Sequence, residues 1–162
     1  MKYCARFILF LPLLGNRLLA SALMCAVICA QANANSSDVF GEAVAKFEKK
    51  EYKDAYTMFK DLYDKKSDDP RVNFYLGLCA FELRKYDDAV LALERTLIME
   101  PNHIRARLEL AKTYFEQKDY QSAEAEFDEV LSNKTIPKEV ADNIVIHKQI
   151  INAKKQKHYL IF

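Results

Sequence analysis

The chain has 162 residues, of which 51% are hydrophobic and 29% charged, and this composition excludes a disordered chain and suffices for one domain with its own core. Only 3 glycines and 4 prolines occur, which favours helices over many short strands and turns. The formal net charge is +1, but all charges before residue 35 are basic, so the remainder is slightly acidic and does not suggest a nucleic-acid-binding surface.

Residues 1–34 have the pattern of a secretory signal peptide. A basic start is followed by an apolar stretch over residues 18–30, and Ala32-Asn33-Ala34 then provides the small side chains that signal peptidase requires. We therefore predict cleavage between Ala34 and Asn35 and a periplasmic or secreted mature chain. The alternative is a retained membrane anchor, which a polar break in the apolar stretch disfavours.

Cysteine usage indicates a mature chain without internal disulfides. Three of the four cysteines precede residue 35, so only Cys79 remains after cleavage. Cys79 lies in an apolar helical run, and we predict a buried, unreactive thiol there.

A repeat of 34 residues organises the chain after the leader. Its clearest column is a tyrosine, followed three residues later by an alanine and seven residues later by a large apolar residue. The three copies are Tyr52, Ala55 and Phe59; Tyr86, Ala89 and Leu93; and Tyr120, Ala123 and Phe127. An earlier column of small residues contains Ala43, Gly77 and Ala111. Small side chains at both columns allow two helices to cross closely, because larger ones would force them apart.

In chain order, this pattern predicts three helical hairpins, over residues 36–69, 70–103 and 104–137, within a domain of residues 35–157. Prolines such as Pro70 fall between the units, where a residue without an N–H ends one helix and can start the next. A further helix over residues 138–157, with one apolar face, is expected to cap the stack.

These columns resemble the tetratricopeptide repeat (TPR) family over about residues 38–135. The second hairpin matches best, through Leu76, Gly77, Tyr86, Ala89 and Pro101. The resemblance implies an all-α fold, a right-handed TPR solenoid of three helical hairpins plus a C-terminal capping helix. It also implies that the first helix of each hairpin lines a concave binding groove.

The groove-facing columns of the family, transferred residue by residue, predict a peptide-binding groove. It consists of Phe40, Val44, Phe47, Arg71, Phe74, Leu78, Phe81, Arg105, Leu108, Lys112 and Phe115. Most of these side chains are apolar, so the expected ligand is a hydrophobic or amphipathic segment of a partner protein. Two alternatives stay open: some of these side chains belong to the core, or a neighbouring domain covers the groove.

The sequence contains no pattern of residues for catalysis. The histidines His103, His147 and His158 have no companion cysteines or paired carboxylates at ligand spacing, so we expect no metal site. There is no phosphate-binding glycine loop and no glycine-flanked serine. We therefore expect a protein–protein interaction scaffold without cofactors and not an enzyme. The identity of the partner and the oligomeric state are left open.

The chain ends in basic residues and then in Tyr159-Leu160-Ile161-Phe162, which is apolar and β-prone. Residues 158–162 are either a tail that packs on the capping helix or the start of a strand that continues outside this chain. An exported repeat region followed by a strand start is similar to the periplasmic part of surface lipoprotein assembly modulators, whose repeats precede an outer-membrane β-barrel. This resemblance implies an alternative function, the truncated N-terminal domain of an outer-membrane barrel protein that assists surface lipoprotein translocation. It also implies an outer-membrane protein as a partner.

Overall fold

The computed structural model describes residues 39–65 and 68–159, with side chains described as far as residue 156. The predicted signal peptide and its cleavage site lie outside the described residues. Residues 160–162 of the predicted tail also lie outside them. Within the described part every regular element is a helix and no strand occurs, which confirms the all-α fold class.

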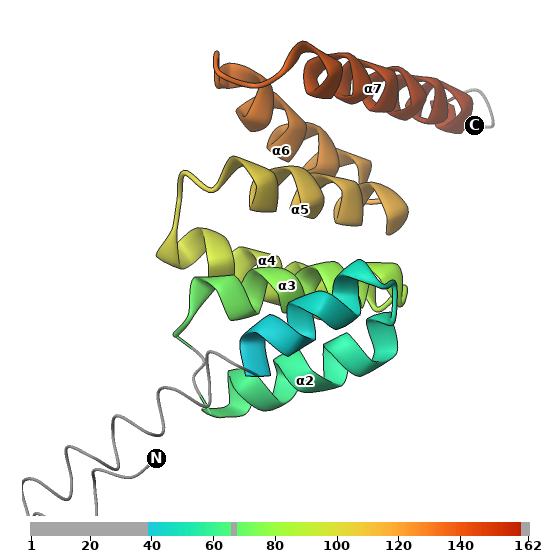
Figure 1. The fold of residues 1–162 in the computed structure, drawn as a ribbon. Helices are drawn as coiled ribbons and strands as arrows, with labels where there is room; N and C mark the ends of the chain where they lie inside the picture. Colours follow the sequence, from blue (N-terminus) through green and yellow to red (C-terminus); the bar gives the residue numbers. More distant parts are fainter. Residues whose placement is uncertain (1–38, 66–67, 160–162) are drawn as a thin grey trace, which may run out of the picture. The chain divides into compact units, whose positions relative to one another are not determined.

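The first described helix covers residues 39–48. It is followed by α2 (Tyr52–Lys65), α3 (Pro70–Glu82), α4 (Tyr86–Met99), α5 (Ile104–Glu116), α6 (Tyr120–Ser132) and α7 (Lys138–Tyr159). Each of these helices packs against the one that precedes it in the chain, and Figure 1 shows them following one another in chain order, from residues 39–48 (blue) to α7 (red). Successive helices form hairpins and neighbouring hairpins stack, which is the arrangement of a helical solenoid.

The same backbone turn connects the two helices of each hairpin. Lys50, Arg84 and Lys118 have positive φ angles of 63°, 58° and 65°. Their N–H groups donate to the carbonyl oxygens of the phenylalanines one residue before the ends of the first helices, at 2.9, 2.9 and 3.0 Å. This left-handed conformation is unfavourable for a residue with a Cβ, but it reverses the chain tightly enough for the repeated tyrosine to start the second helix.

Side chains at the helix starts bind the free N–H groups of the first turn. Asp69 accepts from the Arg71 N–H at 3.0 Å, and Pro70 occupies the first position of α3. His103 Nδ1 accepts from the Ala106 N–H at 3.0 Å at the start of α5. Asp119 accepts from the Ser122 N–H at 3.2 Å, and the hydrogen bonds from Ser122 lower the pKa of its carboxyl group.

The small-residue columns lie where the two helices of a hairpin cross. Ala43 and Ala111 are fully buried, and so are the repeated alanines of the second helices, Ala55, Ala89 and Ala123. A Cβ added to Gly77 would lie 2.7 Å from Leu93 Cγ and 3.5 Å from the Ala89 carbonyl oxygen. These distances confirm the close helix approach predicted from the sequence.

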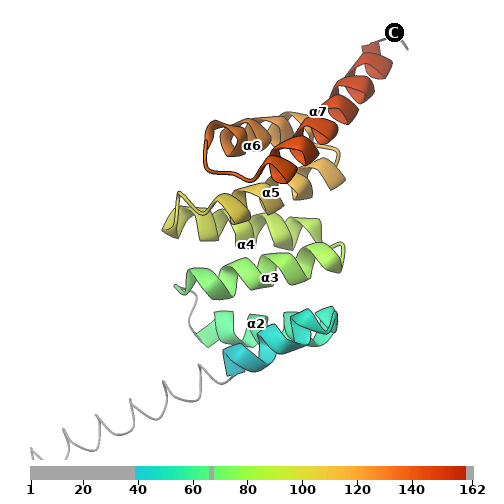
Figure 2. The same ribbon diagram turned by 45° about the horizontal axis from the view of Figure 1, so that its top comes forward.

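α7 covers α6 with one face only. Ile144 and Ile151 are buried in a cluster with Phe127 and Val130 of α6, and α7 lysines form ion pairs with α6 carboxylates. Figure 2 shows the C-terminal part of α7 running on beyond α6. Among the residues that the structure describes, no helix combines the length and hydrophobicity of a transmembrane span.

Candidate functional site

One of the predicted groove columns pairs with the second helix of its own hairpin. The rings of Phe47, Phe81 and Phe115 lie 5.4, 5.9 and 5.9 Å from those of Tyr52, Tyr86 and Tyr120, respectively. All three phenylalanines are half-buried. Aromatic pairs at such distances stabilise packing, so this column helps to close each hairpin next to its turn.

Two members of a second groove column, Phe40 and Phe74, lie beneath the predicted groove residues Arg71 and Arg105. The Arg71 guanidinium carbon is 5.2 Å from the centre of the Phe40 ring, and that of Arg105 is 5.5 Å from the centre of the Phe74 ring. Each arginine comes from the hairpin that follows its ring, and both arginines are exposed. At two successive levels of the stack, an arginine therefore covers the aromatic side chain of this column.

Some of the predicted groove residues belong to the core. Phe74 and Leu78 are each only 6% exposed and pack in a cluster with Leu93, Ala106 and Leu110. Val44 is half-buried against the cluster of the first hairpin. Core packing was one of the alternatives that the sequence left open, and it holds for Phe74 and Leu78 because the following hairpin covers them.

The remaining predicted residues, Leu108, Lys112 and Arg105, line an open region that we call the α5–α7 trough. It consists of two hollows of about 410 and 290 Å³, and both are lined by Leu108 and Val140. The first is completed by Ile104, Arg105, Glu109, Thr135, Ile136 and Pro137. The second is completed by Lys112, Phe127, Asn143, Ile144 and His147. These volumes are close to or within the range of about 300–1,000 Å³ that is usual for ligand pockets.

At the third level of the stack the arginine column stops. Leu108 stands in the column of Phe40 and Phe74, and the next position in the column of Arg71 and Arg105 is Glu139. A carboxylate does not interact favourably with an apolar side chain as a guanidinium does with a ring. Leu108 is half-buried, as Phe40 is beneath Arg71, and it lines both hollows.

Few charges border the trough. Lys112 donates to Glu109 at 3.1 Å, so these two charges largely offset each other. His147 lies against the rings of Phe115 and Phe127, at 5.0 and 5.4 Å, and its Nδ1 is 2.8 Å from the Asn143 carbonyl oxygen. Arg105 is the remaining cation of the trough. The arrangement suits an apolar side chain more than a charged one.

The repeat columns did not identify several trough residues. Ile104, Ile136, Val140 and His147 lie outside the transferred groove columns, because the third hairpin meets a capping helix and not another full hairpin. The change from arginine to Glu139 at the repeat spacing is the sequence signal that could have located the opening.

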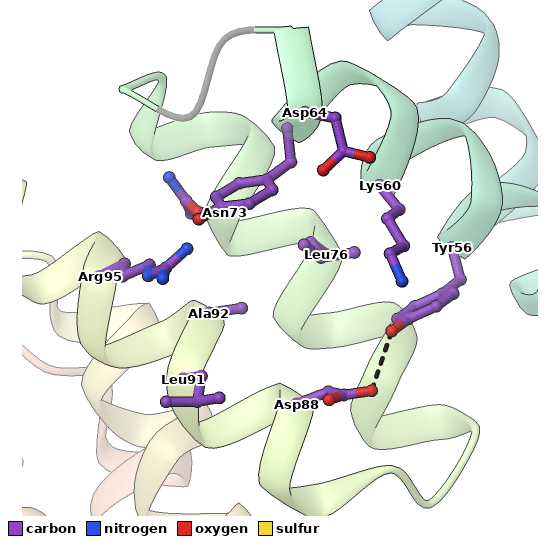
Figure 3. A pocket seen from close by; sticks show the side chains of 10 residues that line it. Tyr56, Lys60, Asp64, Asn73, Leu76, Asp88, Leu91, Ala92 and Arg95 are labelled. Atoms are coloured by element: carbon purple, nitrogen blue, oxygen red, sulfur yellow. Dashed lines mark hydrogen bonds between the residues drawn. The ribbon is translucent and has the colours of Figure 1, made fainter.

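A smaller hollow of about 190 Å³ lies on the side of the second helices (Figure 3). The Tyr56 hydroxyl donates to Asp88 at 2.9 Å within it, and Lys60 and Asp64 from α2 lie across from Arg95 of α4 in Figure 3. The Arg95 guanidinium carbon is also 5.0 Å from the centre of the Tyr63 ring. Because charges of both signs crowd this small space and several already have partners, the α5–α7 trough is the better candidate site.

The described residues contain no group of side chains arranged to hold a metal ion. Cys79 is fully buried, and burial raises the pKa of its thiol to about 12. Since the thiolate is the nucleophilic form, Cys79 is unreactive near neutral pH, as the sequence predicted.

Many solved structures share this fold, among them three that contain a peptide or a binding region of another protein. SycD, a type III secretion chaperone of Yersinia enterocolitica in complex with a peptide of the translocator YopD, is 22% identical, has a TM-score of 0.66 and aligns over 74% of this chain and 93% of its own. PcrH in complex with the chaperone-binding region of PopD is 18% identical, with a TM-score of 0.67 and coverage of 76% and 95%. The first TPR of Spaghetti (RPAP3) bound to an HSP90 peptide is 14% identical, with a TM-score of 0.66 and coverage of 72% and 93%.

At the level of sequence, the chain matches one family. No curated protein matches the sequence significantly. The family model described as "Anaphase-promoting complex, cyclosome, subunit 3" matches residues 48–130, from the end of the first described helix into α6. The match covers all three hairpin turns and the repeated tyrosine, alanine and large apolar columns. Because it extends over more than half of the chain, the chain belongs to this family of TPR-type repeats.

Proposed function

We propose that this chain is an exported TPR scaffold that binds a hydrophobic or amphipathic segment of a partner protein in the α5–α7 trough. The observation that carries the proposal is the open apolar lining shared by the two hollows, centred on Leu108 and Val140. Both residues lie on the side of the stack where the first helices of the hairpins pack, which is the side that the resemblance assigns to binding.

The chemistry of the trough defines the kind of ligand. An amphipathic segment presents apolar side chains three or four residues apart, and such anchors supply most of the binding energy when they enter desolvated pockets. One anchor would enter between Ile104, Ile136 and Val140, and a second beside Ile144. Arg105 at the edge could pair with an acidic residue of the same segment.

The neighbours in fold support a peptide ligand. SycD, PcrH and the first TPR of Spaghetti were each solved with a peptide or a binding region of another protein. The identities are too low to transfer a particular partner, so the proposal rests on the trough itself. Some TPR proteins bind the free carboxylate of a partner with lysine and asparagine side chains in fixed groove columns. This chain has Phe40, Val44 and Tyr75 in the corresponding columns, so we expect no such carboxylate site.

The binding test compares Leu108→Gln and Val140→Gln with the unchanged chain. The probes are fluorescent amphipathic peptides and scrambled versions in which the apolar side chains are not on one face. Fluorescence anisotropy should show binding of the amphipathic set alone and a loss of about tenfold or more in affinity for each variant, about 1.4 kcal/mol. Leu91→Gln is the matched control, since Leu91 is 57% exposed on α4 and lies outside the trough. Equal affinity of Leu108→Gln and the unchanged chain, with helicity retained by both, would contradict the assignment.

Export is a separate part of the proposal and has its own test. N-terminal sequencing of the chain recovered from the periplasmic or secreted fraction should begin at Asn35. A chain recovered only with residues 1–34 attached would contradict cleavage. The alternative function, a front domain for an outer-membrane barrel, stays a prediction, and it requires that the DNA directly downstream encode alternating amphipathic strands.

A further inference from the structure

The outer face of α7 carries three exposed large apolar side chains, although α7 is the last helix of the described stack. Ile146 and Ile150 are 52% and 40% exposed and lie one turn apart, with Val145 at the flank 46% exposed. A helix that only capped the stack would carry polar residues on this side. The exposed isoleucines therefore indicate a contact with another surface.

The charges around this apolar pair are arranged asymmetrically along the helix. Asp142 lies one turn before Ile146, and Lys154 lies one turn after Ile150; both side chains are exposed. Neither forms an ion pair within the described residues. By contrast, Lys148 and Lys155 on the inner side of α7 are paired with Asp128 and Glu124 of α6. The outer face thus has an acidic end, an apolar centre and a basic end, and the two charges are available to a partner.

We propose that two copies of this chain associate through the outer faces of their α7 helices, which run antiparallel about a two-fold axis at the level of Lys148. In this arrangement Ile146 of one copy meets Ile150 of the other, and Asp142 meets Lys154, each contact occurring twice as two-fold symmetry requires. A parallel pair would instead place Asp142 beside Asp142 and Lys154 beside Lys154. Like charges opposite each other oppose association, so the charge pattern selects the antiparallel pair.

This interface is distinct from the α5–α7 trough. The trough uses Val140, Ile144 and His147, which lie on the inner side of α7, whereas Ile146 and Ile150 lie on the outer side. Dimer formation therefore does not depend on peptide binding, and the two proposals can fail independently. A contact made by a single helix from each copy is small, so we expect a weak, micromolar dimer.

Sedimentation velocity of the full chain over micromolar concentrations tests the dimer. The chain should shift from monomer to dimer as its concentration rises. Ile146→Asp and Ile150→Asp should each weaken the dimer by about tenfold or more, because a buried unpaired charge replaces an apolar contact. Ile98→Asp is the matched control, since Ile98 is 78% exposed on α4, and it should leave the dimer unchanged. If the outer face is covered instead by the N-terminal segment of the same chain or by a different protein, the isolated chain will stay monomeric at every concentration, and this result overturns the proposal.

Charge reversal tests the antiparallel geometry. Asp142→Lys places two lysines opposite each other at both ends of the pair, and Lys154→Asp does the same with two aspartates, so each variant alone should dimerise about tenfold or more weakly. When the two variants are mixed, both ends of a mixed pair carry opposite charges, and dimers should reappear. A mixture that stays as monomeric as its components, or single variants that dimerise like the unchanged chain, would overturn the antiparallel arrangement. Circular dichroism of each variant verifies that α7 has not unfolded.

Discussion

The Arg105 guanidinium lies over the ring of Phe74, with its central carbon 5.5 Å from the ring centre. Arg105 belongs to α5 and Phe74 to α3, so this contact joins two successive hairpins across their interface. Arg71 and Phe40 repeat the same contact one level earlier in the chain. The cation–π pair thus recurs at two levels of the stack, and at the third level Leu108, without such a pair, lines both hollows of the trough.

We expect Arg105→Ala to lower the free energy of unfolding by about 0.5–1 kcal/mol, the usual value of such a contact at an exposed site. Denaturant unfolding measures the change, and Lys134→Ala, at an exposed position in the loop before α7, is the control. A double-mutant cycle with Phe74→Leu isolates the pairwise part. A coupling energy near zero would show that the contact contributes nothing.

The two glycines of the described part should respond oppositely to alanine. Gly77→Ala places a Cβ 2.7 Å from Leu93 Cγ at a helix crossing, so we expect a loss of about 1–3 kcal/mol in stability. Gly41→Ala meets no atom within 4 Å and should be neutral or stabilising by up to about 1 kcal/mol, because alanine favours the helix. Thermal or urea unfolding of both variants gives the comparison. A Gly77→Ala protein as stable as the unchanged chain would contradict the close crossing.

Ile150 and Ile151 provide a test of how α7 is attached. Ile151 is fully buried against α6 and Ile150 is 40% exposed, so Ile151→Ala should cost about 2–5 kcal/mol of local stability and Ile150→Ala much less. Because each hairpin contacts only its neighbours, hydrogen exchange should accelerate in α7 and α6 first and leave α3 protected. The measurement belongs at low protein concentration, where the chain is monomeric. Similar exchange in the two variants would mean that α7 does not pack as described.

Two tyrosines should make the fold sensitive to alkaline pH. Burial, and then donation to Asp88 at 2.9 Å, raises the pKa of Tyr56 to about 12. Burial and donation to Glu94 at 2.9 Å likewise raise the pKa of Tyr114 well above its ordinary range. Unfolded tyrosine ionises near pH 10, so the stabilisation is complete below about pH 10 and is lost as the pH rises towards and beyond 12.

The comparison is between the unchanged chain and a variant with both Tyr56→Phe and Tyr114→Phe. At pH 7 the variant should be less stable by about 1 kcal/mol for each lost hydrogen bond. Between about pH 10 and 12 its free energy of unfolding should fall less steeply, because the contribution of the two tyrosines is gone. Parallel pH profiles for the two proteins would contradict the assignment.

The sequence by itself determined the repeat and much of its local geometry. A spacing of 34 residues between Tyr52, Tyr86 and Tyr120 predicts hairpins, because a helix pair is the unit that recurs at that length. The small residue at Gly77 predicts a helix crossing, and the apolar surroundings of Cys79 predict a buried thiol. These features are carried by residue types at fixed spacings along the chain, so the sequence itself contains the information.

Only the tertiary structure decided which of the predicted groove residues are accessible. Phe74 and Leu108 occupy the same repeat column, yet Phe74 is 6% exposed beneath Arg105 while Leu108 lines both hollows of the trough. The outer face of α7 became recognisable in the same way, once α6 was seen to contact the opposite side. The physical reason is that the exposure of a side chain depends on the element that packs against it, and that element belongs to another part of the chain.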